Sequence, residues 1–405
     1  MRLIYAIGVF LYSTVIKIVS LFNEKAKLRL RGTKETFKKL QKFKPKKLIW
    51  IHCASLGEFE QGRPLIEKIK AEKSDYQIAL SFFSPSGYEV RKDYEFADIV
   101  FYLPDDTHKN AEKLISLLNP EYVFFVKYEF WHNYIKHLKL KNIPVYSVSG
   151  IFRRNQIFFK PYGEFFRDTL NFFTHLFVQN NESEKLLKSI GINKTTVVGD
   201  TRFDRVFETS LHKKKFKKVE KFINGALVII AGSTWKPDED IILKFAEEFS
   251  VKVIIAPHLV NEDNINRIIK SATKKAVRYS ENKEENFKNA EVLIIDNIGM
   301  LSSLYFYADI AYTGGGFGAG IHNTLEAAVF GIPIIFGPKY EKFEEAKELI
   351  NRDAGFSISQ YSEFKSLMNR LISDEEFRKQ AGANAGKFVK ENLGATEKIL
   401  SSIKI

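Results

Sequence analysis

The first apolar run of the chain ends in a turn of small residues that contains a lone glutamate, a composition typical of a ligand site. The apolar run "LIWIHC" (48–53) leads into "ASLGEFEQGRPLI", where Glu58 comes directly after Gly57 and before a helical pattern. A carboxylate fixed at such a turn can serve as a general base that deprotonates a sugar hydroxyl. The helix dipole also favours an acid in a first helical turn, so the position alone leaves a structural role open.

A different kind of turn lies in "YTGGGFGAGIHNTLEAAVFGIPIIFGP" (312–338), where residues 314–320 include five glycines. Glycines let a backbone approach a ligand closely, and a helix that opens near Asn323 would add free N–H donors. The stretch predicts a phosphate site, with a flexible turn as the alternative. Its spacing matches neither the dinucleotide fingerprint nor the phosphate loop of nucleotide hydrolases. His322, Asn323 and Glu326 strengthen the prediction, because Glu326 would face the same crevice from one turn inside the helix.

Polar residues follow other apolar runs of the second half. Ser233 and Thr234 lie in "AGSTWKPDED", where they either cap a helix or bind a phosphate, and His258 lies in "APHLVNED". The stretch "DNIGML" places residues 296–300 at a further strand end. A lone histidine is more often structural than catalytic. Polar residues at successive strand ends of one sheet, however, favour a common site.

Two further residues of the first half have the chemistry to meet a substrate. Glu129 lies in "KYEFWHN", where aromatic and polar neighbours suit a wall that faces a sugar, although a buried structural glutamate is the alternative. Arg202 lies in "GDTRFD", and its guanidinium is suited to neutralise a carboxylate or a phosphate.

The elements that would position these residues alternate between short apolar runs and amphipathic stretches. Near-continuous apolar strands joined by helices predict parallel sheets that are covered on both faces. The pattern stops over 205–224 and then restarts, so we expect two doubly wound domains whose strand ends face a cleft. The expected strands are 48–53, 77–83, 99–103, 122–128, 144–150, 175–179 and 195–199, and then 226–233, 251–258, 276–280, 292–297, 310–315, 333–338 and 355–359.

The net charge of +13 is concentrated near the N-terminus, where residues 17–47 hold twelve Lys/Arg and two acids. This distribution argues against a nucleic-acid binder. Residues 3–22 are apolar enough to cross a bilayer as a helix or to lie in its interface, and the basic flank places the rest in the cytoplasm. The lone Cys53 cannot form an internal disulfide and is expected to be a buried thiol.

We therefore expect five segments. These are a membrane anchor (1–22), a basic membrane-surface segment (23–47), an N-terminal domain (48–207), a linker (208–224) and a C-terminal domain (225–405).

The combination of motifs resembles the bacterial 3-deoxy-D-manno-octulosonic acid (Kdo) transferases, glycosyltransferase family 30. The motifs are "HCASLGEFEQGRPLI", "YEFWHN", "GDTRFD", "AGSTWKPDE" and "GGGFGAGIHNTLEAAVFGIPIIFGP". They follow the family's order, and the resemblance extends from about residue 1 to about residue 400.

The resemblance implies an α/β fold of the GT-B type, with an acceptor-binding and a CMP-sugar-binding Rossmann-like domain. It implies inverting, metal-independent transfer of Kdo from CMP-Kdo to a lipid A precursor, without a cofactor, at the cytoplasmic face of the bacterial inner membrane. Glu58 would be the catalytic base, and Glu129 and Arg202 would bind substrate. The donor-binding residues would be those that match the family's, namely Ser233, Thr234, His258, Gly299, Gly315, Gly316, His322, Asn323 and Glu326.

The sequence departs from the family pattern at three places. The family usually has Pro-Arg-His where this chain has Ala256-Pro257-His258, and an acid is often found where Met300 stands. The loop with Arg153 and Arg154 matches only loosely. Two other functions are weighed, a GT-B enzyme that uses a UDP-sugar (a lipid glycosyltransferase or an epimerase) and a membrane scaffold without catalysis. The ordered polar residues at strand ends argue against the scaffold.

Overall fold

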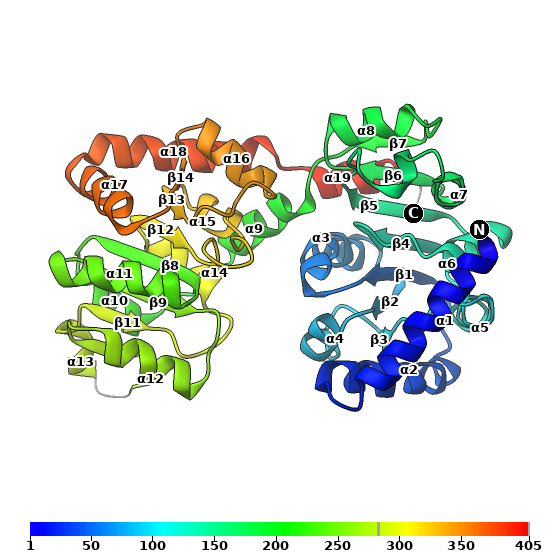
Figure 1. The fold of residues 1–405 in the computed structure, drawn as a ribbon, viewed down its shortest axis with the longest axis horizontal. Coiled ribbons are helices and arrows are strands. Elements are labelled where there is room, and N and C mark those ends of the chain that lie inside the picture. The colour runs from blue at the N-terminus through cyan, green and yellow to red at the C-terminus, as the bar shows by residue number, and fades with distance from the viewer. Residues whose placement is uncertain (282–283, 404–405) are drawn as a thin grey trace. The chain divides into compact units, whose positions relative to one another are not determined.

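The computed structural model describes residues 1–281 and 284–403. The chain forms two compact units, shown in Figure 1. Unit 1 comprises Met1–Arg205 together with the chain from Gly394 onward, and unit 2 comprises Val206–Leu393. The boundary falls inside helix α9 (Thr201–Leu211).

Unit 1 is built on a seven-stranded parallel sheet with the strand order β3-β2-β1-β4-β5-β6-β7. Alternate residues of β1 enter two separate cores, Leu48 and Trp50 on one face and Ile49 and Ile51 on the other. Burial on both faces is why this strand reads as a continuous apolar run. The strands are β1 (Leu48–Cys53), β2 (Gln77–Phe82), β3 (Ile99–Tyr102), β4 (Tyr122–Val126), β5 (Val145–Gly150), β6 (His175–Val178) and β7 (Thr195–Val197).

Helices cover both faces of this sheet. Helix α3 contributes to the core that contains Ile51, whereas α2, α5 and α6 contribute to the core that contains Trp50 (Figure 1). The helical elements are α1 (Arg2–Val19), α2 (Glu24–Lys42), α3 (Leu56–Glu72), α4 (Pro85–Arg91), α5 (His108–Leu118), α6 (His132–Leu140), η1 (Ile157–Phe159), α7 (Glu164–Phe172), α8 (Asn181–Lys188), α9 and α19 (Ala395–Ser401).

Unit 2 repeats the architecture with the strand order β10-β11-β9-β8-β12-β13-β14, again all parallel. The strands are β8 (Val228–Thr234), β9 (Lys252–Pro257), β10 (Ala276–Arg278), β11 (Val292–Ile294), β12 (Ile310–Thr313), β13 (Ile334–Phe336) and β14 (Gly355–Ser357). The helical elements are α10 (Lys217–Ile223), α11 (Lys236–Glu248), α12 (Glu262–Ser271), α13 (Glu284–Lys288), α14 (Leu301–Leu304), η2 (Tyr305–Tyr307), α15 (Leu325–Ala328), α16 (Glu344–Asn351), α17 (Tyr361–Ser373) and α18 (Glu375–Glu391).

The expected fold class is confirmed, because each expected strand forms and both sheets are parallel and doubly wound. Most strands end earlier than the apolar run does. Strand β4, for example, ends at Val126, because Lys127 adopts a left-handed backbone with φ of 69°.

The C-terminal boundary differs from the expected range 225–405. The chain returns to unit 1 at Gly394, where the Asp204 carboxylate accepts the N–H groups of Gly394 and Thr396, each at 2.7 Å. Ile399 and Ile403 then enter the core of unit 1. The expected linker, 208–224, holds the end of α9 and all of α10.

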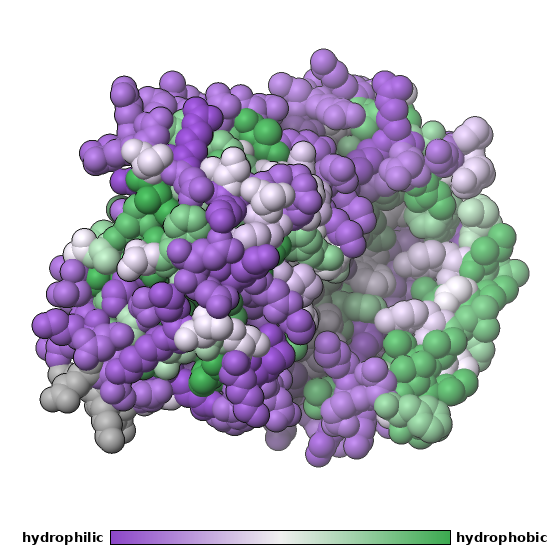
Figure 2. All heavy atoms as spheres, turned by 60° about the vertical axis from the view of Figure 1, so that its left-hand side comes forward, coloured by the Kyte–Doolittle hydropathy of each residue, from purple (hydrophilic) through white to green (hydrophobic). Residues whose placement is uncertain are grey.

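Helices α1 and α2 occupy the range expected for the anchor and the basic segment. Helix α1 is long and apolar enough to span a membrane, and none of its side chains is fully buried. Tyr5, Val9, Ser13 and Ile16, which recur at helical spacing, are half-buried and form a docked face. The opposite face is exposed and apolar, with Leu3, Ile4, Ile7, Phe10, Leu11, Val15 and Ile18. Figure 2 shows this apolar band at the right-hand edge of the view.

Candidate functional site

Glu58 lies in the first turn of α3, at the carboxyl end of β1. The Ser55 hydroxyl donates a hydrogen bond to its carboxylate, and the ammonium of Lys127 lies 3.9 Å from Glu58 Oε1. The Glu58 side chain is 19% exposed, so it is accessible while held from two sides. Lys127 comes from the end of β4, the neighbour of β1 in the sheet, and sequence reasoning did not single it out.

Glu129 lies beyond the end of β4 and is fixed by two donors. Trp131 Nε1–H donates to Glu129 Oε2 at 2.6 Å, and His52 Nε2 lies 3.2 Å from the same oxygen. Trp50 Nε1–H donates to Ser81 Oγ, which leaves the Ser81 hydroxyl to donate to His52 Nδ1 at 2.8 Å. The His52 tautomer with its proton on Nε2 completes this chain of donors, and Glu129 accepts at its end.

The two glutamates follow the carboxyl ends of β1 and β4, which are neighbouring strands. Burial raises the pKa of the Cys53 thiol well above its usual value, and the charges of Glu58 and Glu129 raise it further. Cys53 is free and buried, as expected, and it lies at the end of β1 near both carboxylates. The structure therefore places Glu58 and Glu129 after the carboxyl ends of neighbouring strands, at one edge of the sheet.

Arg202 is the second residue of α9, and its guanidinium pairs with Asp200, two positions earlier, at 2.7 Å. The start of α9 is close to the catalytic candidate, since Thr201 Oγ1–H donates to the backbone oxygen of Gln61 at 2.6 Å, one turn after Glu58. The sequence suggested that Arg202 neutralises a carboxylate or a phosphate. In the structure its partner is a carboxylate of the same chain, that of Asp200. Its role toward substrate stays a prediction.

Three rings meet at the strand ends of unit 2. The Trp235 and His258 rings stack with centroids 4.7 Å apart, and His258 stacks on His322 at 4.7 Å. Trp235 Nε1–H also donates to His322 Nε2 at 3.3 Å. Burial and the neighbouring His258 lower the pKa of His322, so this ring is neutral at pH 7. The sequence-predicted His258 and His322 are thus in contact, and Trp235 joins them.

The glycine-rich loop is held by Asp238, a buried carboxylate that sequence reasoning missed. Asp238 accepts hydrogen bonds from the N–H groups of Gly315 and Trp235 and from the hydroxyl of Tyr312, at 3.0, 2.9 and 2.8 Å. Burial raises the pKa of Asp238, and these three donors oppose that shift. Within the described part of the chain, the N–H groups of Gly316 and Phe317 donate to no protein acceptor, so the loop keeps donors free for an anion.

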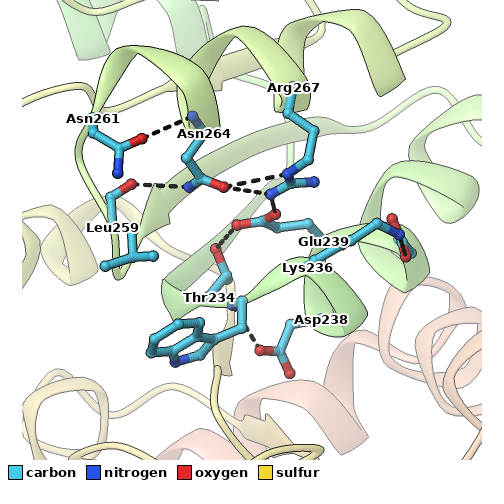
Figure 3. Close-up of polar contacts among 10 residues, drawn as sticks. Thr234, Lys236, Asp238, Glu239, Leu259, Asn261, Asn264 and Arg267 are labelled. Atoms are coloured by element: carbon cyan, nitrogen blue, oxygen red, sulfur yellow. Dashed lines mark hydrogen bonds and ion pairs between the residues drawn. The ribbon is translucent and has the colours of Figure 1, made fainter.

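Thr234 and Ser233 have separate surroundings. The Thr234 hydroxyl is buried and donates to Glu239, which is fully buried and pairs with Arg267 (Figure 3). Thr234 therefore supports the start of α11 through a side-chain contact, whereas the N-cap residue of this helix is Trp235. Ser233 is half-buried with a left-handed backbone, φ of 53°, directly before the buried Thr234.

The helix expected to open near Asn323 is present as the short helix α15. Helix α15 begins at Leu325 and makes a single turn, because Gly331 turns the chain into β13. Asn323 Nδ2–H donates to Glu326 Oε1 at 3.1 Å, so Glu326 lies in the first turn. A one-turn helix has a small dipole, and an anion here would rely on the loop N–H groups instead. Gly299 has φ of 92° with open space beside it.

Sequence signals existed for some of the missed residues. Trp131 and Lys127 flank Glu129 in the same motif, and Trp235 and Asp238 follow Thr234 in another. The amino-acid types of these four residues did not predict their contacts, because the contacts depend on which strands are neighbours in the sheet. Among the described residues, no three His, Cys, Asp or Glu side chains group as metal ligands.

Residues 31–205 match the family model described as 3-deoxy-D-manno-octulosonic-acid transferase (kdotransferase). A 3-deoxy-D-manno-octulosonic acid transferase of Aquifex aeolicus is 28% identical over 83% of this chain and 91% of its own length. A bifunctional glycosyltransferase/methyltransferase of Fusobacterium nucleatum is 29% identical over 87% of this chain. The match spans only 57% of that relative's length.

A solved structure shares the fold at low sequence identity. A putative UDP-N-acetylglucosamine 2-epimerase of Listeria monocytogenes superposes with a TM-score of 0.63 over 89% of this chain and 96% of its own. Its sequence identity is 13%, so the likeness concerns the GT-B fold alone.

Proposed function

We propose that this chain, a member of the Kdo transferase family, is a glycosyltransferase that moves Kdo from CMP-Kdo to a lipid A precursor. The reaction would belong to the assembly of the lipopolysaccharide core. The observation that supports it best is the Glu58 carboxylate, held at the carboxyl end of β1 by Ser55 and Lys127, on the same edge of the sheet as Glu129. The expectation of a UDP-sugar enzyme rests on the fold alone and is not favoured.

Glu58 would act as the general base in unit 1. It would take the proton of an acceptor hydroxyl while the hydroxyl oxygen attacks the anomeric carbon of Kdo, and CMP would leave. Attack from the side opposite the leaving phosphate inverts the anomeric centre. Glu129, with its orientation set by Trp131 and His52, would accept a hydrogen bond from the acceptor sugar.

Unit 2 would bind the nucleotide of the donor. The free N–H groups of Gly316 and Phe317 would donate hydrogen bonds to the leaving phosphate. These donors would stabilise its charge in place of a metal ion or another cofactor. Gly316 lies where a side chain does not fit, since an added Cβ would stand 2.6 Å from the Gly337 backbone. The rings of Trp235, His258 and His322 would form the wall beside the phosphate.

The exposed apolar face of α1 supports membrane association, and the basic residues of 17–47 favour the cytoplasmic face of the bacterial inner membrane. Tyr5 O–H donates to Asp106 at 2.6 Å, and the Tyr12 ring stacks on Phe83 with centroids 6.0 Å apart, so α1 is docked along unit 1. A helix that crossed the bilayer would leave these partners. We therefore propose that α1 lies in the membrane interface, with the basic residues of α2 near anionic headgroups.

The test is transfer by the purified chain from CMP-Kdo to a defined lipid A precursor, read by mass spectrometry of the product. The Glu58→Ala variant should lose about 100-fold or more in kcat. Glu72→Ala, at the exposed end of the same helix, is the matched control. Near-normal transfer by Glu58→Ala would remove the base assignment. A melting temperature raised by UDP but not by CMP would contradict the donor assignment.

A further inference from the structure

A stack of aromatic rings joins the surface helix α1 to the candidate acceptor site. The Tyr12 and Phe83 ring planes are 29° apart with centroids 6.0 Å apart, and Phe83 lies against Trp131 at 4.9 Å and 30°. Trp131 Nε1–H then donates to Glu129 Oε2 at 2.6 Å. The contact path from α1 to the Glu129 carboxylate is therefore continuous.

Arg29 of α2 clamps the middle of this stack. Its guanidinium lies 3.5 Å from the centre of the Phe83 ring, and Nη1–H donates to the Phe83 backbone oxygen at 2.7 Å. A second bond, also 2.7 Å, runs from Nη2 to Asp105. Arg29 is 5% exposed, so its charge is withdrawn from solvent and directed at this segment. The ring and backbone of Phe83 are thus fixed together.

The Phe83 segment also supports the turn that carries Glu58. The N–H groups of Phe83 and Ser84 both donate to the backbone oxygen of Ala54, at 3.2 and 2.7 Å. Ala54 directly precedes Ser55, whose hydroxyl donates to the Glu58 carboxylate. Phe83 therefore lies next to the supports of both candidate carboxylates, through its ring for Glu129 and through its backbone for Glu58.

A second contact of α1 reaches the same region. The Tyr5 hydroxyl donates to Asp106, and the Asp106 carboxylate accepts the N–H groups of Asn133 and Tyr134 at 3.0 and 3.1 Å. These N–H groups open helix α6, which begins directly after Trp131. Two turns of α1 therefore contact the surroundings of Trp131. Tyr12 contacts Phe83, which packs on the Trp131 ring, and Tyr5 contacts Asp106, which holds the start of α6.

We propose that α1 is a positioning element of the acceptor site, acting through Tyr12 and Phe83 on Trp131 and Glu129, in addition to any role at the membrane. This inference rests on the proposed transferase function. A helix that served only as an anchor would affect transfer to a lipid acceptor held in a membrane. A positioning helix also affects transfer to an acceptor that is free in water.

The test compares two acceptors, the lipid A precursor in phosphatidylethanolamine/phosphatidylglycerol vesicles and its deacylated, water-soluble sugar. The variants are Tyr12→Leu, Phe83→Leu and the double variant. Phe10→Leu is the matched control, because it removes an exposed aromatic ring from the same helix. Vesicle flotation measures membrane binding, and thermal unfolding reports whether each variant folds.

We expect Phe83→Leu to lower kcat on the soluble acceptor by about 10-fold or more, since small misplacements of a site are costly. Tyr12→Leu should lower it less, and the double variant should be no worse than Phe83→Leu, because both changes interrupt one path. Phe83→Tyr keeps the ring and should restore kcat. Phe10→Leu should weaken flotation only and leave soluble turnover unchanged.

Wild-type kcat on the soluble acceptor for both leucine variants would overturn this inference, as would strictly additive losses in the double variant. Loss confined to the vesicle acceptor would also overturn it and leave α1 as an anchor alone. A wild-type chain that transfers no Kdo to either acceptor overturns the proposed function and this inference with it.

Discussion

Lys127 places its ammonium 3.9 Å from the Glu58 carboxylate from a backbone with φ of 69°. A non-glycine residue in the left-handed region costs about 1 kcal/mol or more, so the surrounding fold must maintain this conformation. The turn directs Lys127 toward the end of β1 and ends β4 shortly before Glu129. The strained residue therefore contacts one candidate carboxylate, Glu58, and precedes the other, Glu129, by two positions in the chain.

Replacing Lys127 with methionine should slow transfer. Methionine keeps the length and the apolar stem but removes the charge that holds one side of Glu58, so Ser55 alone would hold the carboxylate among the contacts described above. We expect kcat to fall by about 10-fold, which corresponds to about 1.4 kcal/mol of transition-state stabilisation. Steady-state kinetics with CMP-Kdo measure the change.

Lys139→Met is the control, since Lys139 is exposed on the same unit. Equal kinetics for Lys127→Met and Lys139→Met would show that the Lys127 charge has no part in the reaction.

Replacing Asp238 with asparagine should weaken nucleotide binding. Oδ2 of Asp238 accepts the N–H groups of Gly315 and Trp235, and Oδ1 accepts the Tyr312 hydroxyl. Asparagine has one acceptor oxygen, so either the two N–H groups or the Tyr312 hydroxyl would lose an acceptor, and in both orientations the negative charge that strengthens the hold on Gly315 is removed. The glycine loop would then be free to move away from its present position. We expect the Kd for CMP to rise by about 10-fold, a change of about 1.4 kcal/mol, as measured by calorimetry.

Asp240→Asn tests whether the effect is local, because Asp240 lies on the same helix and is exposed. An unchanged Kd in Asp238→Asn would separate the loop from nucleotide binding.

The strands and their order of appearance were predictable from the sequence. Runs such as "LIWIHC" are apolar at nearly every position because both faces of β1 are buried, as is usual for a central parallel strand. The same logic predicted that Glu58 and Glu129 lie at the ends of strands. Their proximity depended on β1 and β4 being neighbours, which the sheet order supplied.

What escaped prediction depends on contacts between distant segments. Nothing near Asp238 in the sequence reveals that Tyr312 and Gly315, which lie far along the chain, donate to it. The helix at Leu325 is short because the chain must turn into β13, a demand of the sheet rather than of local propensity. The return of the chain at Gly394 likewise follows from the Asp204 carboxylate, which receives its N–H groups.

Asp106 should make the stability of unit 1 depend on pH. Burial raises its pKa from 3.8 to about 6 in the folded protein, so the folded state binds a proton more tightly than the unfolded chain does. The resulting stabilisation is present below pH 3.8 and is lost as the pH rises through 6. The loss amounts to about 3 kcal/mol at most, from the conversion of pKa shifts to free energy.

The measurement is the difference in unfolding free energy between the wild type and Asp106→Asn at several pH values. Asparagine does not titrate, so the wild type should lose stability relative to the variant between about pH 4 and about pH 6.5. His132, whose pKa burial lowers to about 4, is present in both proteins and largely cancels in the difference. A difference that stays constant with pH would mean that Asp106 has the same pKa in the folded and unfolded states.

Gly316 and Gly318 form a matched pair within the glycine-rich loop. A Cβ on Gly316 would lie 2.6 Å from the backbone of Gly337, whereas a Cβ on Gly318 would meet only the Gly315 oxygen at an ordinary 3.5 Å. Because backbone cannot yield as a flexible side chain does, Gly316→Ala must displace the loop or the start of the segment after β13. We expect a lower melting temperature by thermal unfolding and about 10-fold weaker CMP binding.

Gly318→Ala should leave both quantities near the wild-type values, since the residue is exposed and its neighbours accept a methyl group. The pair separates close packing from flexibility as the reason for glycine in this loop. If flexibility were the reason, both substitutions would weaken CMP binding to a similar extent. If close packing is the reason, only Gly316→Ala does so, and the free N–H groups of the loop owe their position to the contact with Gly337.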